Sequence, residues 1–521
     1  MLLLNHDAYG KLGMVFLKQK RYFEALYCFH KAYCIAPNNI ACRYNLANAL
    51  SYSGNEDEAI ESLKGIVADH PDATIAWKRL ALLLLTRQRP EEAVDCLEKL
   101  HHLLPDDPEV LCTLGILYYR QSRLSEAIKC LKHVVQLNRQ HINALETLGA
   151  ALHETGDLQQ AEECFQGVLQ IAPHRISALN NLGTVYLSMG LLEHAAAVLG
   201  TALNHEPENS QVRFNRALVR LALGDLPKAW SDYEARFATQ HPARLQHPEF
   251  PRWFGEPLTG RTLLVQTEQG FGDTFQFVRY LTVLRLWGGQ IILECQDQSV
   301  RDGLGDIQGI ELIVRGEPLP AIDYQIPLLS LPGLFQTTET TIPCPEGYLK
   351  AFEYKVAEWK QRLKLRTGFL HVGLVWSGTR YRLNADRSLH LLQLLPLLEM
   401  TGIQFYGLQL GDDRQQIRKL QAKLIDLGAQ IESFADTAAI LTHLDLLISV
   451  DTAVAHLAGA LGQPVWILLK YAPDWRWLRE RHDSPWYRSA RLFRQPQPGD
   501  WHPVVLQVKR ELQFFRDRQK K

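Results

Sequence analysis

The sequence predicts an α-helical solenoid followed by an α/β region made of two lobes. Three observations lead to this fold class. The first half of the chain repeats with a period of 34 residues and needs no insertion to keep its register. From residue 262 onward, short apolar runs of β-forming residues alternate with amphipathic helical patterns. The chain has 521 residues, 46% of them hydrophobic, which is enough for about three packed domains at roughly 100–200 residues each.

The repeat is defined by small residues at fixed positions of each block. Position 20 is alanine in every block, position 8 is glycine or alanine, position 24 is large, and position 32 is proline in five blocks. Two helices approach closely where small residues face each other, and proline ends the second helix. The blocks begin at His6, Ile40, Thr74, Pro108, Ile142, Ile176 and Ser210. Period and pattern resemble the tetratricopeptide repeat, and seven such repeats are expected over residues 6–240.

The first helix of each repeat should line a concave surface. Position 6 of that helix points inward and carries an amide in three blocks, as Asn45, Asn181 and Asn215. Because an amide can donate to and accept from a peptide backbone, these residues are candidates for a peptide-binding groove. The alternative is that they belong to ordinary solvated helix faces.

The second half is expected to begin with a proline-rich linker over residues 241–260. An N-terminal Rossmann-like lobe should follow over 261–350, then an inter-lobe helix within 351–367 and a C-terminal Rossmann-like lobe over 368–521, with a cleft between the lobes. The expected strands are 262–266, 290–294, 310–314 and 324–327, then 371–376, 404–408, 430–432, 444–450 and finally 465–469. The expected helices are 274–287, 299–304, 356–365, 391–400, 414–427 and 452–461.

Two glycines follow the first strand, at Gly270 and Gly272, and Asp273 comes directly after them. Glycines at this place let backbone N–H groups approach a ligand, and the start of a helix favours an anion or a hydroxyl donor. The alternative for Asp273 is a first-turn helix residue favoured by the helix dipole.

Hydroxyl residues and arginines follow the strand expected at 371–376. They are Ser377, Gly378 and Thr379, then Arg380, Arg382, Arg387 and Ser388. Guanidinium groups pair bidentately with phosphate oxygens, and ligands of open α/β sheets bind beyond the carboxyl ends of the strands. A phosphate cradle is therefore predicted, with a solvated basic loop as the alternative.

The stretch around Asp451 is the most specific in the chain. An apolar strand runs into Asp451, then Thr452 and Ala453 begin a helix that carries His456 one turn later. Amides and the helix dipole suit a pyrophosphate, while the carboxylate and imidazole suit sugar hydroxyls. The alternative for His456 is a buried structural histidine.

Together these motifs resemble the lipopolysaccharide heptosyltransferase family. The residues 451–456 look like that family's donor site, 270–273 like its amino-terminal loop, and 376–379 with 387–388 like its phosphate-binding segment. The whole plan looks like the bacterial tetratricopeptide-repeat glycosyltransferases and is similar to the protein O-linked N-acetylglucosamine transferases. Two departures stand out: a short amino-terminal lobe, and arginines where heptosyltransferases tend to use a lysine.

The resemblance implies a metal-independent transferase of the GT-B type. A nucleotide sugar would bind the C-terminal lobe as a substrate, with no cofactor, and Asp273 would correspond to the base. A protein or glycoconjugate acceptor would be recruited by the repeats and would enter from the N-terminal lobe, which is the acceptor side. The rival hypotheses are a peptide-binding scaffold that has lost catalysis, and lobes that bind a nucleotide only as a regulatory signal.

The amino-acid composition excludes several classes of protein. Lys and Arg number 56 against 57 for Asp and Glu, which excludes a strongly basic nucleic-acid binder. No apolar run reaches the length of a membrane span. The nine cysteines form no C-x-x-C pair, so neither a disulfide framework nor a zinc knuckle is indicated. A soluble, cytoplasmic protein is expected.

The tryptophans around Asp474 and Arg476 are expected to pack the interior of the C-terminal lobe, with these two residues as possible contacts to the donor.

Overall fold

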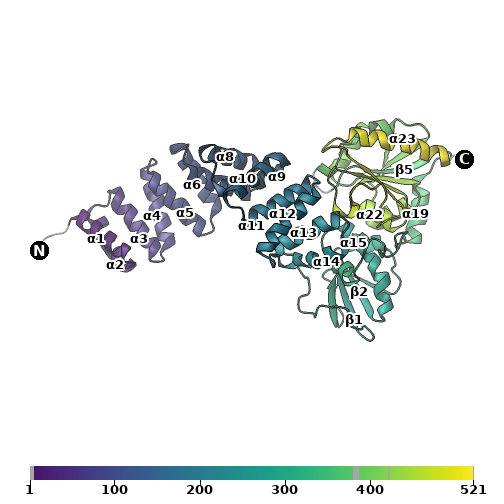
Figure 1. Ribbon diagram of the computed structural model, residues 1–521, viewed down its shortest axis with the longest axis horizontal. Coiled ribbons are helices and arrows are strands. Elements are labelled where there is room, and N and C mark those ends of the chain that lie inside the picture. Colours follow the sequence, from purple (N-terminus) through teal and green to yellow (C-terminus); the bar gives the residue numbers. More distant parts are fainter. Residues whose placement is uncertain (1–4, 379–385, 421–422, 520–521) are drawn as a thin grey trace. The chain divides into compact units, whose positions relative to one another are not determined.

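The computed structural model describes residues 5–378, 386–420 and 423–519 (Figure 1). It divides into two compact units, the first over Met1–Pro173 and the second over His174–Lys521. The first contains five helical hairpins, and the second contains two more hairpins and all the strands of the described residues.

Fourteen α-helices precede the first strand in the described part of the chain. In the first unit they are α1 (His6–Lys18), α2 (Tyr22–Ile35), α3 (Ile40–Tyr52), α4 (Glu56–Asp69), α5 (Thr74–Thr86), α6 (Pro90–Leu103), α7 (Pro108–Arg120), α8 (Leu124–Leu137), α9 (Ile142–Thr155) and α10 (Leu158–Ile171). In the second unit they are α11 (Ile176–Ser188), α12 (Leu192–His205), α13 (Ser210–Ala222) and α14 (Leu226–Tyr233), followed by the 3₁₀ helix η1 (Glu234–Ala238). Every odd-numbered helix from α1 to α13 begins at the first residue of a predicted block. The prediction of helical repeats and their register is confirmed.

The small and large positions of the repeat meet inside each hairpin. The alanine at position 20 is fully buried in all seven repeats, and the large residue at position 24 is buried in all seven. In the sixth repeat, a Cβ added at Gly183 would lie only 2.6 Å from the Leu199 Cγ. The glycine therefore lets the second helix place a full-sized side chain against the first helix, as the sequence pattern requires.

Two parallel sheets follow in the second unit. The first has the order β3-β2-β1-β4 and the second the order β10-β9-β8-β5-β6-β7. The strands are β1 (Thr262–Gln266), β2 (Gln290–Cys295), β3 (Glu311–Val314), β4 (Tyr324–Pro327), β5 (Leu370–Val375), β6 (Ile403–Gly407), β7 (Leu424–Asp426), β8 (Leu446–Val450), β9 (Val465–Leu469) and β10 (Ala490–Arg494). Every strand pair is parallel. The parallel order explains why the central strands read as continuous apolar runs, since helices cover both faces of such sheets.

Helices connect and cover these strands. Around the first sheet they are α15 (Phe271–Phe277), η2 (Val278–Tyr280), α16 (Leu281–Leu284), η3 (Arg285–Trp287), α17 (Gln298–Leu304), η4 (Leu328–Ser330) and α18 (Leu331–Leu334). Around the second they are α19 (Glu353–Leu363), η6 (Leu391–Leu394), α20 (Leu395–Leu398), η7 (Asp412–Lys419), α21 (Phe434–Leu441), α22 (Ala453–Ala460), η8 (Trp475–Trp477) and α23 (His502–Gln519). The single helix predicted over 274–287 is thus a series of short α and 3₁₀ turns that begins earlier, at Phe271.

Three predictions in the second lobe are wrong. The predicted helix over 414–427 is the 3₁₀ helix η7 followed by strand β7, and no strand forms at 430–432 in the described structure. Ile417, Leu424 and Leu427 are buried, and their spacing fits a helix as well as it fits a 3₁₀ turn and an edge strand. The strand at 465–469 is not the last one, because β10 pairs with it in parallel at the sheet edge.

The segment expected as a linker over 241–260 packs against the first sheet. The Trp253 N–H donates to the Gln325 carbonyl at 2.9 Å, and the Gln325 N–H donates to the Pro251 carbonyl at 2.9 Å. Trp253 and Leu258 are fully buried. The prolines therefore mark an ordered edge of the sheet, consistent with the confinement of proline to edges.

No helix in the described ranges has both the length and the apolar character to cross a membrane.

The close contact of Gly183 with Leu199 in the sixth repeat allows the packing of the hairpin to be tested. Gly183→Ala should destabilise the protein by about 1–2 kcal/mol, because overpacking costs about 1–3 kcal/mol and helix propensity returns up to about 1 kcal/mol. The matched control is Gly200→Ala in α12, where nothing in the described structure lies within 4 Å of the added Cβ. That change should stabilise the protein slightly. Urea midpoints followed by circular dichroism would measure both, and a shift of both variants in the same direction would contradict the packing account.

Candidate functional site

A cavity of about 620 Å³ opens at the carboxyl ends of the second sheet. The sheet order changes direction between β5 and β8, and a crevice at such a switch point is where open α/β sheets bind ligands. The cavity is lined by Phe271, Val375, Ser377, Gly378, Arg387, Leu408, Gln409, Leu410, Gly411, Asp412, Asp413, Phe434, Thr452, Ala453 and Val454. Of the predicted donor residues, Ser377, Gly378, Arg387, Thr452 and Ala453 are therefore brought together at one place.

The segment that follows β5 is fixed by hydrogen bonds to side chains of the segment that follows β6. The Gln409 carboxamide oxygen accepts from the backbone N–H groups of Trp376 and Ser377 at 3.1 and 2.9 Å. The Ser377 hydroxyl donates to the Asp413 carboxylate at 2.5 Å. Gln409 and Asp413 were not singled out from the sequence, because nothing local distinguishes them from loop residues.

The Arg387 guanidinium packs against Gly378, one of the predicted site residues. A Cβ added at Gly378 would lie 2.9 Å from the Arg387 Nε, so the absence of a side chain at Gly378 makes room for the guanidinium. A cation and a serine hydroxyl thus share one wall of the cavity, which suits an anionic group. The predicted residues Thr379 and Arg382, and Arg380 beside them, lie outside the described residues.

Asp451 and His456 are not among the described residues that line the cavity, although the next residues, Thr452 and Ala453, are. The His456 Nε2 is 3.5 Å from an Asp451 carboxylate oxygen, and its Nδ1 is 2.9 Å from the Tyr487 hydroxyl. The imidazole also stacks on Trp477, with ring centroids 5.1 Å apart. Burial raises the pKa of Asp451, but the hydrogen bond and charge of His456 and the charge of Arg387 outweigh it and hold the pKa below its usual value. Both ring nitrogens have protein partners, as a structural histidine would.

Asp273 is held between two partners. One carboxylate oxygen accepts from the Gly270 N–H at 2.8 Å, which closes the first turn of α15, and the other pairs with the Arg476 guanidinium. Arg476 also donates to Asp474 and Gln276, both at 2.8 Å. Burial alone would lower the pKa of Arg476, but Asp273 and Asp474 raise it above its usual value. The sequence indicated Arg476 only as a possible donor contact, since its partner Asp273 is about 200 residues away.

Gly272 sets the distance between α15 and α22. A Cβ added there would lie 2.8 Å from the His456 ring and 3.5 Å from the Ala453 Cα. The first turn of α15, which carries Asp273, therefore packs directly on α22, the helix that borders the cavity.

The predicted groove asparagines differ in exposure. In the first unit, Asn45 lines a groove of about 490 Å³ together with Lys11, Asp7 and Ala41. In the second unit, Asn215 is buried and donates to the Asn180 side chain at 2.8 Å, and Asn181 is partly buried. Asn45 therefore lies in a groove, whereas the Asn215 carboxamide is hydrogen-bonded to a neighbouring helix.

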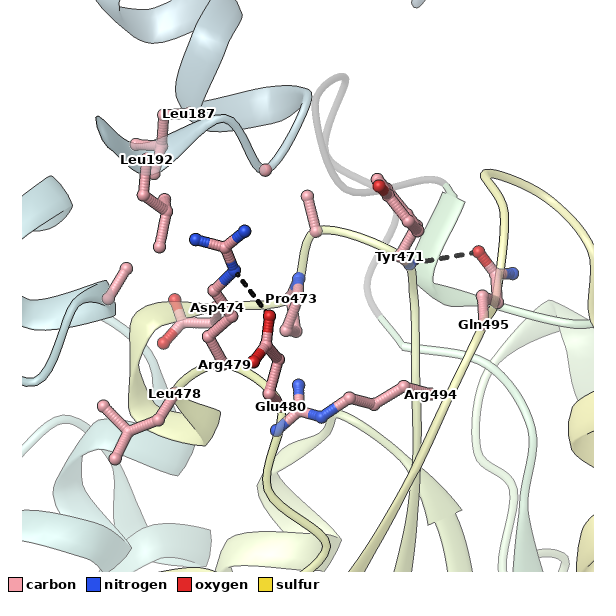
Figure 2. A pocket seen from close by; sticks show the side chains of 13 residues that line it. Leu187, Leu192, Tyr471, Pro473, Asp474, Leu478, Arg479, Glu480, Arg494 and Gln495 are labelled. Carbon is pink, nitrogen blue, oxygen red and sulfur yellow. Dashed lines mark hydrogen bonds and ion pairs between the residues drawn. The ribbon is translucent and has the colours of Figure 1, made fainter. Parts of the chain in front are cut away.

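A second cavity, of about 230 Å³, lies in the second unit beside the ends of α11 and α13 (Figure 2). Its opposite side is formed by the loop that follows β9, which carries Asp474.

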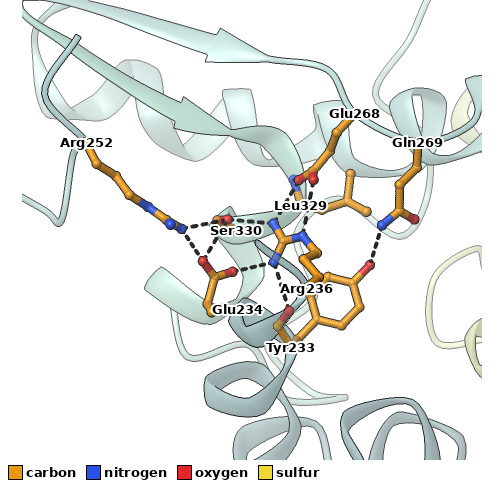
Figure 3. A network of polar contacts seen from close by, with 8 residues as sticks. All are labelled: Tyr233, Glu234, Arg236, Arg252, Glu268, Gln269, Leu329 and Ser330. Atoms are coloured by element: carbon orange, nitrogen blue, oxygen red, sulfur yellow. Dashed lines mark hydrogen bonds and ion pairs between the residues drawn. The ribbon is translucent and has the colours of Figure 1, made fainter. Parts of the chain in front are cut away.

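A buried ion network fills the switch point of the first sheet, between β1 and β4 (Figure 3). The Arg236 guanidinium, 2% exposed, donates to Glu268 at 2.8 Å, to Glu234 at 2.7 Å and to the Ser330 hydroxyl at 2.8 Å. Gln269 donates to the Tyr233 hydroxyl at 3.1 Å. Residues that end the last repeat thus anchor the loop that leads to Asp273.

The N-terminal half of the chain is a solenoid of tetratricopeptide repeats, and a C-terminal region with two parallel sheets follows it. Family models of the tetratricopeptide repeat match residues 16–83, 140–208 and 180–244. A model described as subunit 3 of the anaphase-promoting complex, or cyclosome, matches residues 87–168. The repeats mark the N-terminal half of the chain as a region for protein interaction.

A curated relative is Protein FlbA of Caulobacter vibrioides, 30% identical over 343 residues, with 59% of this chain and 55% of that protein covered. The match thus spans about half the length of this relative. Among solved structures, YrrB, described as a tetratricopeptide-repeat protein with an unusual peptide-binding site, is 22% identical with a TM-score of 0.34, covering 35% of this chain and 95% of its own. A tetratricopeptide-repeat protein of Parabacteroides merdae is 18% identical with a TM-score of 0.35, covering 44% and 91%.

The contact between α15 and α22 can be tested through Gly272. Gly272→Ala should destabilise the protein by about 1–3 kcal/mol, because Tyr487 and Asp451 keep the His456 ring from moving aside. The matched control is Gly270→Ala, whose added Cβ would meet only the Asp273 carboxylate at 3.3 Å in the described structure. Thermal unfolding of the full chain would compare the two, and equal melting temperatures would contradict the close contact.

Proposed function

We propose that the protein is a glycosyltransferase that moves a sugar from a nucleotide-sugar donor to a protein or glycoconjugate acceptor. The observation that carries this proposal is the cavity at the β5–β8 switch point, where Ser377, Gly378, Arg387 and the start of α22 converge. A volume of about 620 Å³ suits a small-molecule site, for which about 300–1,000 Å³ is usual. The resemblance of residues 451–456 to a heptosyltransferase donor site, and a GT-B arrangement of two Rossmann-like lobes, belong to the same proposal.

In this proposal the diphosphate of the donor binds beside Arg387. The guanidinium supplies positive charge, and the backbone N–H groups at the start of α22 and the Ser377 hydroxyl supply hydrogen bonds. Arg387 would therefore stabilise the charge that develops on the leaving group, without requiring a metal. Asp451 and His456 would support this wall from behind by fixing the start of α22.

In the transfer step, we assign the role of general base to Asp273. An acceptor hydroxyl oxygen forms a bond to the anomeric carbon while the bond from that carbon to the diphosphate oxygen breaks. The hydroxyl proton passes to the Asp273 carboxylate, and the nucleoside diphosphate leaves with the electron pair of the broken bond. Arg476 is a positioning residue here, because it holds the carboxylate in one orientation.

The repeats would recruit the acceptor. The groove that contains Asn45 offers an amide and the charged side chains Lys11 and Asp7, which suit an extended polypeptide.

A second candidate function is a scaffold without catalysis. It is favoured by the partners that the candidate residues already have, since Asp273 is paired with Arg476 and His456 with Tyr487. In a scaffold these contacts would be purely structural, and no sugar would be transferred.

Donor binding is tested by a thermal-shift panel of nucleotides and nucleotide sugars on the full chain. A ligand at about 100 times its Kd should stabilise the unit that binds it by roughly 2.7 kcal/mol. Arg387→Ala should abolish the shift by removing the phosphate partner, and His456→Ala should reduce it by loosening α22. Melting without ligand controls for folding. Normal donor affinity in both folded variants would refute the assigned donor site, and a flat panel for the native protein would favour the scaffold.

The base is tested by turnover with the donor that the panel identifies. Asp273→Asn should keep donor binding and lower kcat by at least about 100-fold, since general base catalysis contributes about 10²–10⁴-fold. Arg476→Lys keeps the charge but loses the forked geometry, so it should lower kcat less than Asp273→Asn does. Unchanged turnover in Asp273→Asn would remove Asp273 as the base.

A further inference from the structure

The smaller cavity of the second unit has two chemically different sides (Figure 2). The repeats contribute Leu187, Leu192 and Ala222, which are apolar. The opposite side comes from residues 471–480 after β9 and from Arg494 at the end of β10. In Figure 2 the Arg494 side chain extends from its strand toward Glu480 and Leu478. The cavity of about 230 Å³ is large enough for one or two side chains of a bound chain.

Arg494 is a partly buried cation with only carbonyl partners. Its guanidinium donates to the backbone carbonyls of Arg481 and Trp477 at 3.2 and 2.6 Å. Among the described residues, no carboxylate lies within ion-pair distance of it. Burial, together with the nearby Arg481, lowers the pKa of Arg494 to about 10. A guanidinium that has lost water without gaining a counter-charge favours an anionic ligand.

The other charged groups of the cavity are already paired. Arg479 contacts Glu193 at 2.8 Å and Glu480 at 3.4 Å. Asp474 accepts from Arg476 at 2.8 Å. Arg494 is therefore the one cation in the described lining without an acidic partner.

Gln495 borders the same cavity and is 4% exposed. Its carboxamide oxygen accepts from the Tyr471 N–H at 3.2 Å. Its Nε2 is buried and has no hydrogen-bond partner among the described residues. In Figure 2 this carboxamide lies beside Tyr471, away from the Arg494 guanidinium, so it is a separate polar group of the lining.

We propose that this cavity binds an acidic side chain of a polypeptide partner, with an apolar neighbour of that side chain seated against the repeats. Arg494 would pair with the carboxylate, and Leu187, Leu192 and Ala222 would cover the apolar residue. A polypeptide is the fitting source of both groups, since the cavity lies at the edge of repeats that serve protein interaction.

The position of the cavity connects it to the candidate base. Asp474 lines the cavity, and its partner Arg476 pairs with Asp273. A polypeptide anchored at Arg494 would therefore lie next to the short loop that positions Asp273. This step rests on the proposed function, whereas peptide binding at the cavity does not.

Binding is measured by fluorescence anisotropy with two pools of end-blocked, labelled octapeptides. The pools are random at all positions except a central one, which is Glu in one pool and Gln in the other. The full chain, without any nucleotide sugar, should bind the Glu pool about tenfold more tightly, as expected for a hydrogen-bonded charge. Arg494→Gln should remove that preference.

Two further variants keep the test decisive if Arg494→Gln fails to fold. Glu480→Gln removes an exposed carboxylate from the lining and should tighten binding of the Glu pool about twofold to threefold. Arg488→Gln, which removes an exposed arginine paired with Glu346 outside the described lining, should change nothing. Equal binding of the two pools, a preference that survives in folded Arg494→Gln, or no effect of Glu480→Gln would each overturn the proposal. Because no sugar transfer is measured, these results are independent of the turnover test.

Discussion

The ion pair between Asp273 and Arg476 joins the segment that follows β1 of the first sheet to the segment that follows β9 of the second. Arg476 is 7% exposed and lies after β9, whereas Asp273 lies after β1. A guanidinium that is removed from water needs several partners, and breaking such a buried pair commonly costs about 3–5 kcal/mol. Asp474 and Gln276 supply the other partners. The requirement to satisfy this one cation therefore fixes the loop after β1 against the loop after β9, and with them the contact of Gly272 with His456.

The two sheets use their switch points differently. The main cavity lies at the switch point of the second sheet, whereas the ion network around Arg236 lies at that of the first, with a cavity of about 330 Å³ lined by Glu234 and Ser330 beside it. Arg236 and its partners thus have two roles. They complete the packing between the last repeat and the first sheet, and they hold the loop that leads to Asp273, the residue that would act as the base in a transferase. A transferase and a scaffold would share this framework, so the distinction between them depends on whether a sugar is transferred from a donor bound in the β5–β8 cavity.

Much of the fold could be predicted because its causes are local. Alanine at position 20 and a large residue at position 24 act within a single hairpin, so the period alone placed all seven helix starts. The strands β1, β4 and β9 were predicted to the residue, and β1 and β9 each contain the run of apolar residues that is typical of a buried parallel strand. The errors at 414–427 arose where the spacing of Ile417, Leu424 and Leu427 suits more than one backbone conformation.

The sequence by itself determined the repeat register, the central strands and the grouping of Ser377, Gly378, Arg387, Thr452 and Ala453 at strand ends. Those features follow from spacing along the chain and from the rule that parallel strands end at one edge. Only the tertiary structure decided that Asp273 meets Arg476, that His456 is buried against Tyr487 and that Arg494 has no acidic partner in the described lining. Each of these depends on residues far apart in sequence, and pairing and burial arise only when the whole chain has packed.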